Sequence, residues 1–110
     1  MAETMRAAVL DGPGRPLRML RVPVPVPGPG QILIRLEASG VCHTDVHVWQ
    51  GDTLPKVAPD PFVLGHEGVG RVAALGPGVT GWRVGDRAGA AWTHSACGAC
   101  EECRSGWESF

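Results

Sequence analysis

The sequence predicts a mainly β domain with short helices, arranged as a barrel or a sandwich. Sixteen glycines and ten prolines among 110 residues interrupt any long helix. Short segments that favour β structure recur along the chain and are separated by glycine-rich turns, a spacing typical of barrels and sandwiches. A chain of this length forms one domain with one hydrophobic core.

Five strands are expected, over residues 5–10, 19–22, 31–38, 67–75 and 83–91. The third strand alternates apolar and polar residues in part, as a strand with one buried face does. Turns that contain glycine close the first strand and separate the last two strands.

Two segments between the strands have other compositions. Residues 42–50 contain neither glycine nor proline, and we expect a short helix with Thr44 and Asp45 as its N-cap. Residues 22–30 carry a proline at every second position, and proline cannot donate a backbone hydrogen bond. This proline-rich segment is therefore expected to form an extended surface arm or an edge segment.

Charge and hydropathy exclude several classes of protein. The formal net charge is −1 and the basic residues are scattered, so nucleic acid and anionic membranes are not expected partners. No apolar run approaches the ~20 residues that a membrane span needs. Residues 1–10 include Glu3 and Arg6 and lack the apolar centre of a signal peptide, which indicates a cytoplasmic protein. Four cysteines are then expected to be metal ligands or reactive thiols rather than disulfides.

Cys42 and His66 are candidate ligands of a zinc ion that keeps one position open for chemistry. Taken singly, such a cysteine is more often a small buried hydrophobic residue than a metal ligand. Their neighbours favour a metal. Glycines flank the His66–Glu67 pair and allow close approach to the backbone. Asp45 could accept the second ring N–H of a metal-bound histidine. Glu67 is a supporting group or an occasional ligand, or else a solvated acid.

Thr44 and His47 are candidate proton carriers. Residues three apart share one face of a helix, so a hydroxyl at Thr44 could pass a proton to an imidazole one turn later. Imidazole exchanges protons near neutral pH. The alternative is a capping threonine and an exposed histidine. His43 could contact a phosphate, or could be a surface histidine.

Cys97, Cys100 and Cys103 form a stronger pattern, because two-residue gaps let successive thiolates surround one ion. The bacterial iron–sulfur pattern requires a fourth cysteine four residues after the third, followed by proline. Trp107 occupies that position, so zinc is favoured over a cluster. A closed structural zinc site needs four ligands, and the local sequence supplies three. Cys42 is expected to be too distant to be the fourth.

These motifs together resemble the amino-terminal catalytic domain of zinc-dependent medium-chain alcohol dehydrogenases. The zinc signature G-H-E-x₂-G-x₅-G/A-x₂ of that family, followed by a small or β-branched residue, is met in full over residues 65–79. The resemblance extends over residues 5–110 and is closest in pattern to tetrameric microbial enzymes that use NAD. It implies a GroES-like barrel, small alcohol or aldehyde substrates, NAD and two zinc sites.

The resemblance also implies a role for each candidate residue. Its catalytic zinc ligands would be Cys42 and His66, with Glu67 as an alternative ligand and Asp45 as the partner of His66. Thr44 and His47 match the proton relay, His43 approaches the cofactor pyrophosphate, and Trp92 forms a wall of the alcohol pocket. Three of the four structural zinc ligands would be Cys97, Cys100 and Cys103.

Two departures from the family pattern affect these expectations. Close relatives often carry tryptophan after Gly-Asp in the loop where this chain has Thr53, so a wider pocket is expected. The family pattern places the fourth structural cysteine directly after Phe110, and the third catalytic ligand and the Rossmann domain later. We therefore expect residues 1–110 to be a fragment that is inactive alone, with an incomplete structural-zinc lobe at 94–110.

Two alternatives stay open at this point. One is a standalone, non-catalytic barrel that binds zinc or responds to redox conditions. The other is a related reductase that acts on aldehydes, which is the same chemistry in the opposite direction.

Overall fold

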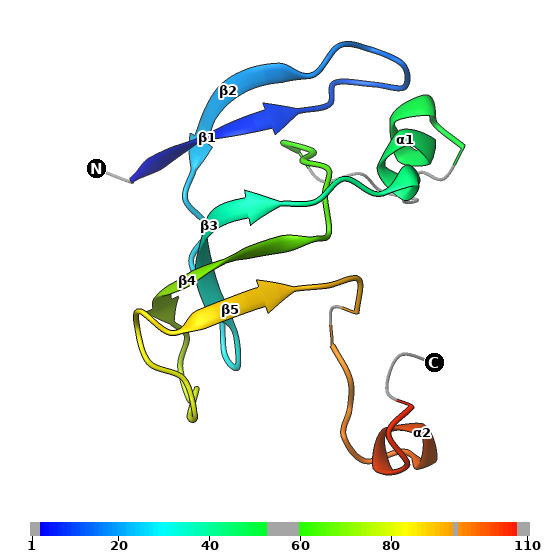
Figure 1. Cartoon of the computed structure of the whole chain (residues 1–110). Coiled ribbons are helices and arrows are strands. Elements are labelled where there is room, and N and C mark those ends of the chain that lie inside the picture. Colours follow the sequence, from blue (N-terminus) through cyan, green and yellow to red (C-terminus); the bar gives the residue numbers. More distant parts are fainter. Residues whose placement is uncertain (1–2, 53–59, 94, 108–110) are drawn as a thin grey trace.

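A computed structural model describes residues 3–52, 60–93 and 95–107 of the chain (Figure 1). Its elements in order are β1 (Thr4–Val9), β2 (Arg18–Pro23), β3 (Ile32–Ser39), α1 (His43–Gln50), β4 (Gly68–Leu75), β5 (Arg87–Ala90) and α2 (Glu101–Arg104). The expected mainly β class with short helices is confirmed. Among the described residues, no helix is long and apolar enough to cross a membrane.

The strands are divided between two antiparallel sheets (Figure 1). β1 and β2 form a hairpin in which Ala7 lies opposite Leu20. Ala7, Val9 and Val22 are buried together there, and Leu20 packs against them. An isolated bridge between Val9 and Val63 joins this hairpin to the segment that leads into β4.

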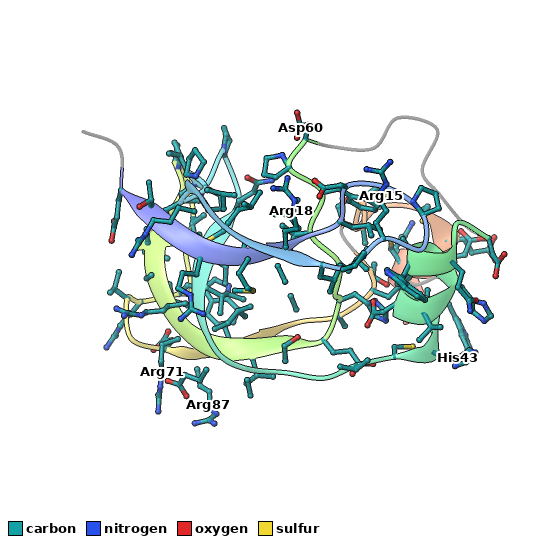
Figure 2. All side chains as sticks on the ribbon, turned by 90° about the horizontal axis from the view of Figure 1, so that it is seen from above. Arg15, Arg18, His43, Asp60, Arg71 and Arg87 are labelled. Carbon is teal, nitrogen blue, oxygen red and sulfur yellow. The ribbon has the colours of Figure 1, made fainter. Side chains whose placement is uncertain are left out.

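β4 is the central strand of the second sheet, between β3 and β5. Its burial alternates with a period of two, and Val72 is the most buried large side chain among the described residues, at 2% exposure. The opposite face is open to solvent and carries a row of arginines in direct register, of which Figure 2 labels the last two: Arg35, Arg71 and Arg87. This sheet therefore buries one face and exposes the other.

The fifth strand is shorter than expected, because it begins at Arg87 rather than at residue 83. The backbone N–H of Asp86 donates to the carbonyl of Arg83 at 3.0 Å. The Asp86 carboxylate in turn accepts a hydrogen bond from the Arg83 N–H at 2.8 Å. In this local turn, the N–H and carbonyl of Arg83 and the N–H of Asp86 are bonded within the turn, so they are not available for pairing with a neighbouring strand.

Helix α1 begins at His43 with Cys42 as its N-cap, so the N-cap expected at Thr44 and Asp45 was wrong. Asp45 occupies the third helical position, and its carboxylate accepts the Cys42 backbone N–H at 3.1 Å. This contact is the reciprocal half of a capping box. Gly51 ends the helix in the left-handed conformation, with φ of 89°.

Two hydrogen bonds fix the β1–β2 loop on α1. The indole N–H of Trp49 donates to the Arg15 carbonyl at 2.7 Å. The Gly14 N–H donates to the Trp49 carbonyl, also at 2.7 Å. An Asp11–Arg18 ion pair closes the same loop at its base. The hairpin and the helix are therefore held together across 34 residues of sequence.

The proline-rich segment 22–30 begins at the end of β2. Its first two residues belong to β2, a strand of the two-stranded sheet, and the rest forms no strand. Val26 in this segment is 88% exposed. Helix α2 and the segment that leads into it lie away from both sheets (Figure 1).

Candidate metal centres

Cys42, His66 and Glu67 come together although they belong to different segments. One ligand atom from each lies within 4.8 Å of the others. Cys42 caps α1, while His66 and Glu67 occupy the turn that leads into β4. Gly65 precedes them with φ of 110°, a conformation that other residues rarely adopt. The glycine thus permits the sharp turn that brings His66 toward the helix N-terminus.

Asp45 connects the two main ligands. Its Oδ1 atom lies 3.3 Å from Nδ1 of His66, while its Oδ2 atom accepts the Cys42 backbone N–H. Both side chains of the pair are largely buried, with 19% exposure for His66 and 17% for Asp45. A carboxylate on Nδ1 leaves Nε2 of the imidazole free to bind a metal, and raises its basicity.

Local hydrogen bonds favour the metal-binding state of the cysteine. The backbone N–H and the hydroxyl of Thr44, followed by the His66 ring, lower the pKa of the Cys42 thiol. The sulfur lies 3.6 Å from Oγ1 of Thr44. The pKa of His66 is raised, first by its hydrogen bond to Cys42 and also by the charge of Asp45. The thiolate form of Cys42, which is the form that binds a metal, is therefore favoured at this position.

Gly40 determines where the Glu67 side chain can lie. A Cβ atom added at Gly40 would collide with the carboxylate of Glu67. The Gly40 N–H donates to the Glu67 carbonyl at 3.0 Å, so the two backbones are also joined. The missing side chain at Gly40 thus leaves room for Glu67 beside Cys42 and His66.

Trp92 lies against the same centre. Its ring meets the His66 ring edge to face, with centroids 4.8 Å apart. The indole is 69% exposed, so one side of it faces open space. Thr53, which we expected opposite this wall, lies outside the described residues.

The expected proton carriers occupy α1 as the spacing required. Thr44 is beside the Cys42 sulfur, and His47 is exposed one turn farther along the helix. The imidazole of His47 is close to two other groups. Its Nδ1 lies 3.6 Å from Oδ2 of Asp52, and its ring meets His43 edge to face at 4.6 Å.

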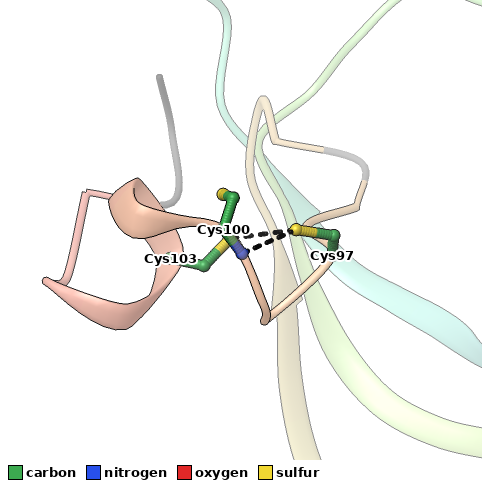
Figure 3. A group of neighbouring side chains, drawn as sticks. All are labelled: Cys97, Cys100 and Cys103. Carbon is green, nitrogen blue, oxygen red and sulfur yellow. Dashed lines mark hydrogen bonds between the residues drawn. The ribbon is translucent and has the colours of Figure 1, made fainter.

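Cys97, Cys100 and Cys103 form a second group whose sulfur atoms lie within 4.8 Å of one another (Figure 3). The Cys97 and Cys103 sulfurs are 3.8 Å apart. Cys97 accepts backbone N–H groups from Ala99 at 3.4 Å and Cys100 at 3.3 Å. These N–H groups are the main cause that lowers the pKa of Cys97 to about 7.

Both groups fit zinc by the chemistry of their donors. Thiolate and imidazole are the ligands that zinc prefers, and thiolates spaced two residues apart are typical of structural sites. The two groups are separate, so Cys42 is not part of the three-cysteine cluster. Neither group offers four protein ligands among the described residues.

Sequence reasoning did not identify three residues that support these centres. Gly40 accommodates Glu67, while Trp49 and Arg15 join α1 to the first hairpin. Each acts through a residue distant in sequence. A lone glycine before Val41-Cys42 and a tryptophan inside a short helix gave no local signal of those contacts.

Comparison with known proteins agrees with this architecture. Residues 28–110 match the alcohol dehydrogenase GroES-like domain. An alcohol dehydrogenase of Rhizobium meliloti (strain 1021) is 57% identical over 107 residues, which cover 97% of this chain and 31% of the relative. An alcohol dehydrogenase of Geobacillus stearothermophilus is 47% identical over 108 residues, covering 96% of this chain and 31% of that protein.

Solved structures give the same result. A thermostable alcohol dehydrogenase from Pyrobaculum aerophilum, with cobalt and zinc bound, superposes with a TM-score of 0.87 at 37% identity. The match covers 98% of this chain and 32% of that structure. An NAD-dependent alcohol dehydrogenase superposes with a TM-score of 0.81 at 41% identity, over 96% of this chain and 31% of the other.

The fold and the sequence match define a GroES-like domain of the alcohol dehydrogenase type. The chain belongs to the alcohol dehydrogenase family, through its GroES-like domain. It spans about a third of the length of the curated relatives that it matches.

Proposed function

We propose that this chain supplies the zinc-binding part of an NAD-dependent alcohol dehydrogenase, which oxidises primary or secondary alcohols to aldehydes or ketones. The observation that carries the proposal is the convergence of Cys42 and His66 on one point, with Asp45 bonded toward both. The names of similar proteins support the reaction class, and an NAD-dependent and a zinc-bound enzyme are among them.

Cys42 and His66 would hold the catalytic zinc, with Glu67 as an alternative ligand. Zinc supplies a Lewis acid for the alcohol oxygen, and NAD supplies the hydride acceptor. Asp45 keeps the His66 ring in the tautomer that presents Nε2. Cys97, Cys100 and Cys103 would hold a structural zinc, whose closed site requires one further ligand.

Thr44 and His47 would move the alcohol proton. The Thr44 hydroxyl lies beside the Cys42 sulfur, so it would be close to an alcohol that binds at this centre. His47 has a side chain that is 47% exposed and can pass the proton to solvent. His43, exposed on the same helix, would approach the cofactor pyrophosphate. Trp92 would form one wall of the alcohol pocket, and Thr53 would leave the opposite side wide.

Two further parts of the proposal concern the whole protein. The 110-residue chain alone is expected to be inactive, since it contains no nucleotide-binding glycine motif after a strand. The complete enzyme is expected to be a homotetramer. Its substrate is expected to be a small alcohol or aldehyde.

A chimera tests the proposal. This chain replaces the corresponding residues of the Rhizobium meliloti relative, to which it is 57% identical. We expect NADH formation from alcohols, and its loss when Cys42→Ser is introduced. Thr80→Ser, an exposed hydroxyl-conserving change outside both centres, is the matched control and should keep the activity. A folded, zinc-loaded chimera that forms no NADH with any primary or secondary alcohol would contradict the proposal.

A further inference from the structure

Two histidines on helix α1 belong to neither cysteine group. His43 and His47 lie four residues apart, which places them on the same face of the helix. Both are exposed, and Figure 2 shows His43 on the α1 side of the molecule, away from the two sheets. Their rings meet edge to face with centroids 4.6 Å apart. The helix has therefore already brought two imidazoles together.

This spacing suits chelation of one ion. Two ring nitrogens that bind the same metal at ~2.0–2.1 Å are roughly 3 Å apart. Rings with centroids at 4.6 Å reach that separation by rotation about their side-chain bonds, without movement of the helix. Histidines at this helical spacing are the metal-binding pair in the H-E-x-x-H motif. Imidazole suits zinc, copper and nickel.

Asp52 adds a third element to this pair. Its Oδ2 atom lies 3.6 Å from Nδ1 of His47. Its own backbone N–H donates to the His47 carbonyl at 3.0 Å, so Asp52 is held next to the ring by the end of the helix. A carboxylate on Nδ1 directs Nε2 outward and makes it a better ligand. Asp45 has the same relationship to His66 in the first centre.

We propose that His43 and His47 form a third metal site, which binds one divalent transition ion of the nickel or zinc type through two imidazole nitrogens. Asp52 is its positioning residue, and solvent completes the coordination. The consequence for activity depends on the proposed function, because the same two rings would serve the proton relay and the cofactor. An ion bound there withdraws both rings from those roles, so the site would be inhibitory. Binding itself does not depend on the reaction.

Nickel binding to the zinc-loaded chain tests the site directly. The cysteine groups are first occupied with zinc, and Ni²⁺ is then titrated while the imidazole signals are followed by NMR. We expect the His43 and His47 signals to respond first. His43→Gln and His47→Gln should each lower the nickel affinity at least tenfold. The matched control is His94→Gln, which removes one imidazole and leaves His43 and His47 in place. The nickel affinity of this variant should differ from that of the wild-type chain by less than twofold.

Asp52→Asn tests the positioning role. We expect a loss of roughly three- to tenfold in nickel affinity, below the ~10–100-fold typical of supporting groups because this site is exposed. The ¹⁵N shifts of His47 should also move toward the Nε2–H tautomer, which a purely structural contact would not cause. Circular dichroism checks that each variant keeps its fold. The proposal would be overturned if folded His43→Gln or His47→Gln bound nickel as tightly as the wild-type chain. It would also be overturned if the NMR signal of another histidine responded first to nickel.

Discussion

The Nδ1 atom of His66 lies 3.3 Å from the Oδ1 atom of Asp45, and both side chains are largely buried. The carboxylate therefore fixes the ring of one candidate ligand. Because its second oxygen also accepts the Cys42 N–H, it fixes the backbone of the other ligand. A single aspartate in the first turn of α1 thus links the helix cap to the metal centre.

Asp45→Asn should weaken zinc binding at Cys42 and His66. An amide loses the negative charge and cannot accept through both atoms, so the ring and the helix cap are no longer fixed together. We expect a loss of about 10–100-fold in zinc affinity at this centre. The His66 ¹⁵N shifts during a zinc titration measure it. Asp60→Asn is the control, since Asp60 is exposed and outside both groups. Equal affinities in the two variants would contradict this role.

The reactivity of Cys97 should depend on pH around neutrality. In the metal-free chain its pKa is lowered to about 7, chiefly by the backbone N–H groups of Ala99 and Cys100. The thiolate is the reactive form. Alkylation of Cys97 by iodoacetamide should therefore reach half its maximal rate near pH 7 and fall about tenfold for each pH unit below. Peptide mass spectrometry follows the modification of each cysteine. Cys97→Ser should remove only the alkylation that has its midpoint near pH 7. A midpoint near the ordinary thiol pKa would refute the assignment.

Gly40→Ala should destabilise the domain, because the added methyl group would occupy the place of the Glu67 carboxylate. Overpacking in a core costs ~1–3 kcal/mol, and because the exposed Glu67 carboxylate can move aside in part, we expect a loss at the low end of that range. Urea unfolding measures the loss. Gly12→Ala is the matched control, since a Cβ atom there would meet only Arg15 side-chain atoms, at 3.6 Å. If both variants unfold at the same urea concentration, Glu67 does not lie over Gly40.

Trp49→Phe should loosen the β1–β2 loop. The substitution keeps an aromatic ring and removes the 2.7 Å hydrogen bond to the Arg15 carbonyl. We expect a loss of about 0.5–1.5 kcal/mol in the free energy of unfolding. Amide exchange at Gly14 should also accelerate, because this N–H is bonded to the Trp49 carbonyl. Trp82→Phe, at a half-exposed tryptophan in another loop, should leave Gly14 exchange unchanged.

Local patterns in the sequence predicted the strands and the three-cysteine cluster, since strand composition and the spacing of Cys97, Cys100 and Cys103 are properties of short segments. The glycines and acids beside Cys42 and His66 already favoured a shared metal, and the resemblance to a family strengthened the prediction that the two residues meet. The helix cap was misplaced because the preference for threonine and aspartate at N-caps was overridden: Asp45 caps from the third helical position instead.

Contacts between distant segments could not be predicted. Gly40 is explained only by the position of Glu67, and Trp49 only by the return of the β1–β2 loop to α1. The fifth strand was predicted too long because the pairing of Arg83 with Asp86 competes with strand formation. Each of these features depends on which backbone groups meet in the folded chain.

Zinc titration of the 110-residue chain against a chelating dye tests the central claim most directly. The claim is that two separate groups of residues bind zinc independently. We predict that these two groups give two tight binding steps in the wild-type chain, ahead of any weaker zinc binding at His43 and His47, which offer no thiolate. Cys42→Ser should remove one step, Cys103→Ser should remove the other, and each should leave the remaining step unchanged. A single step in the wild-type chain, or the loss of both steps in either folded variant, would contradict the account.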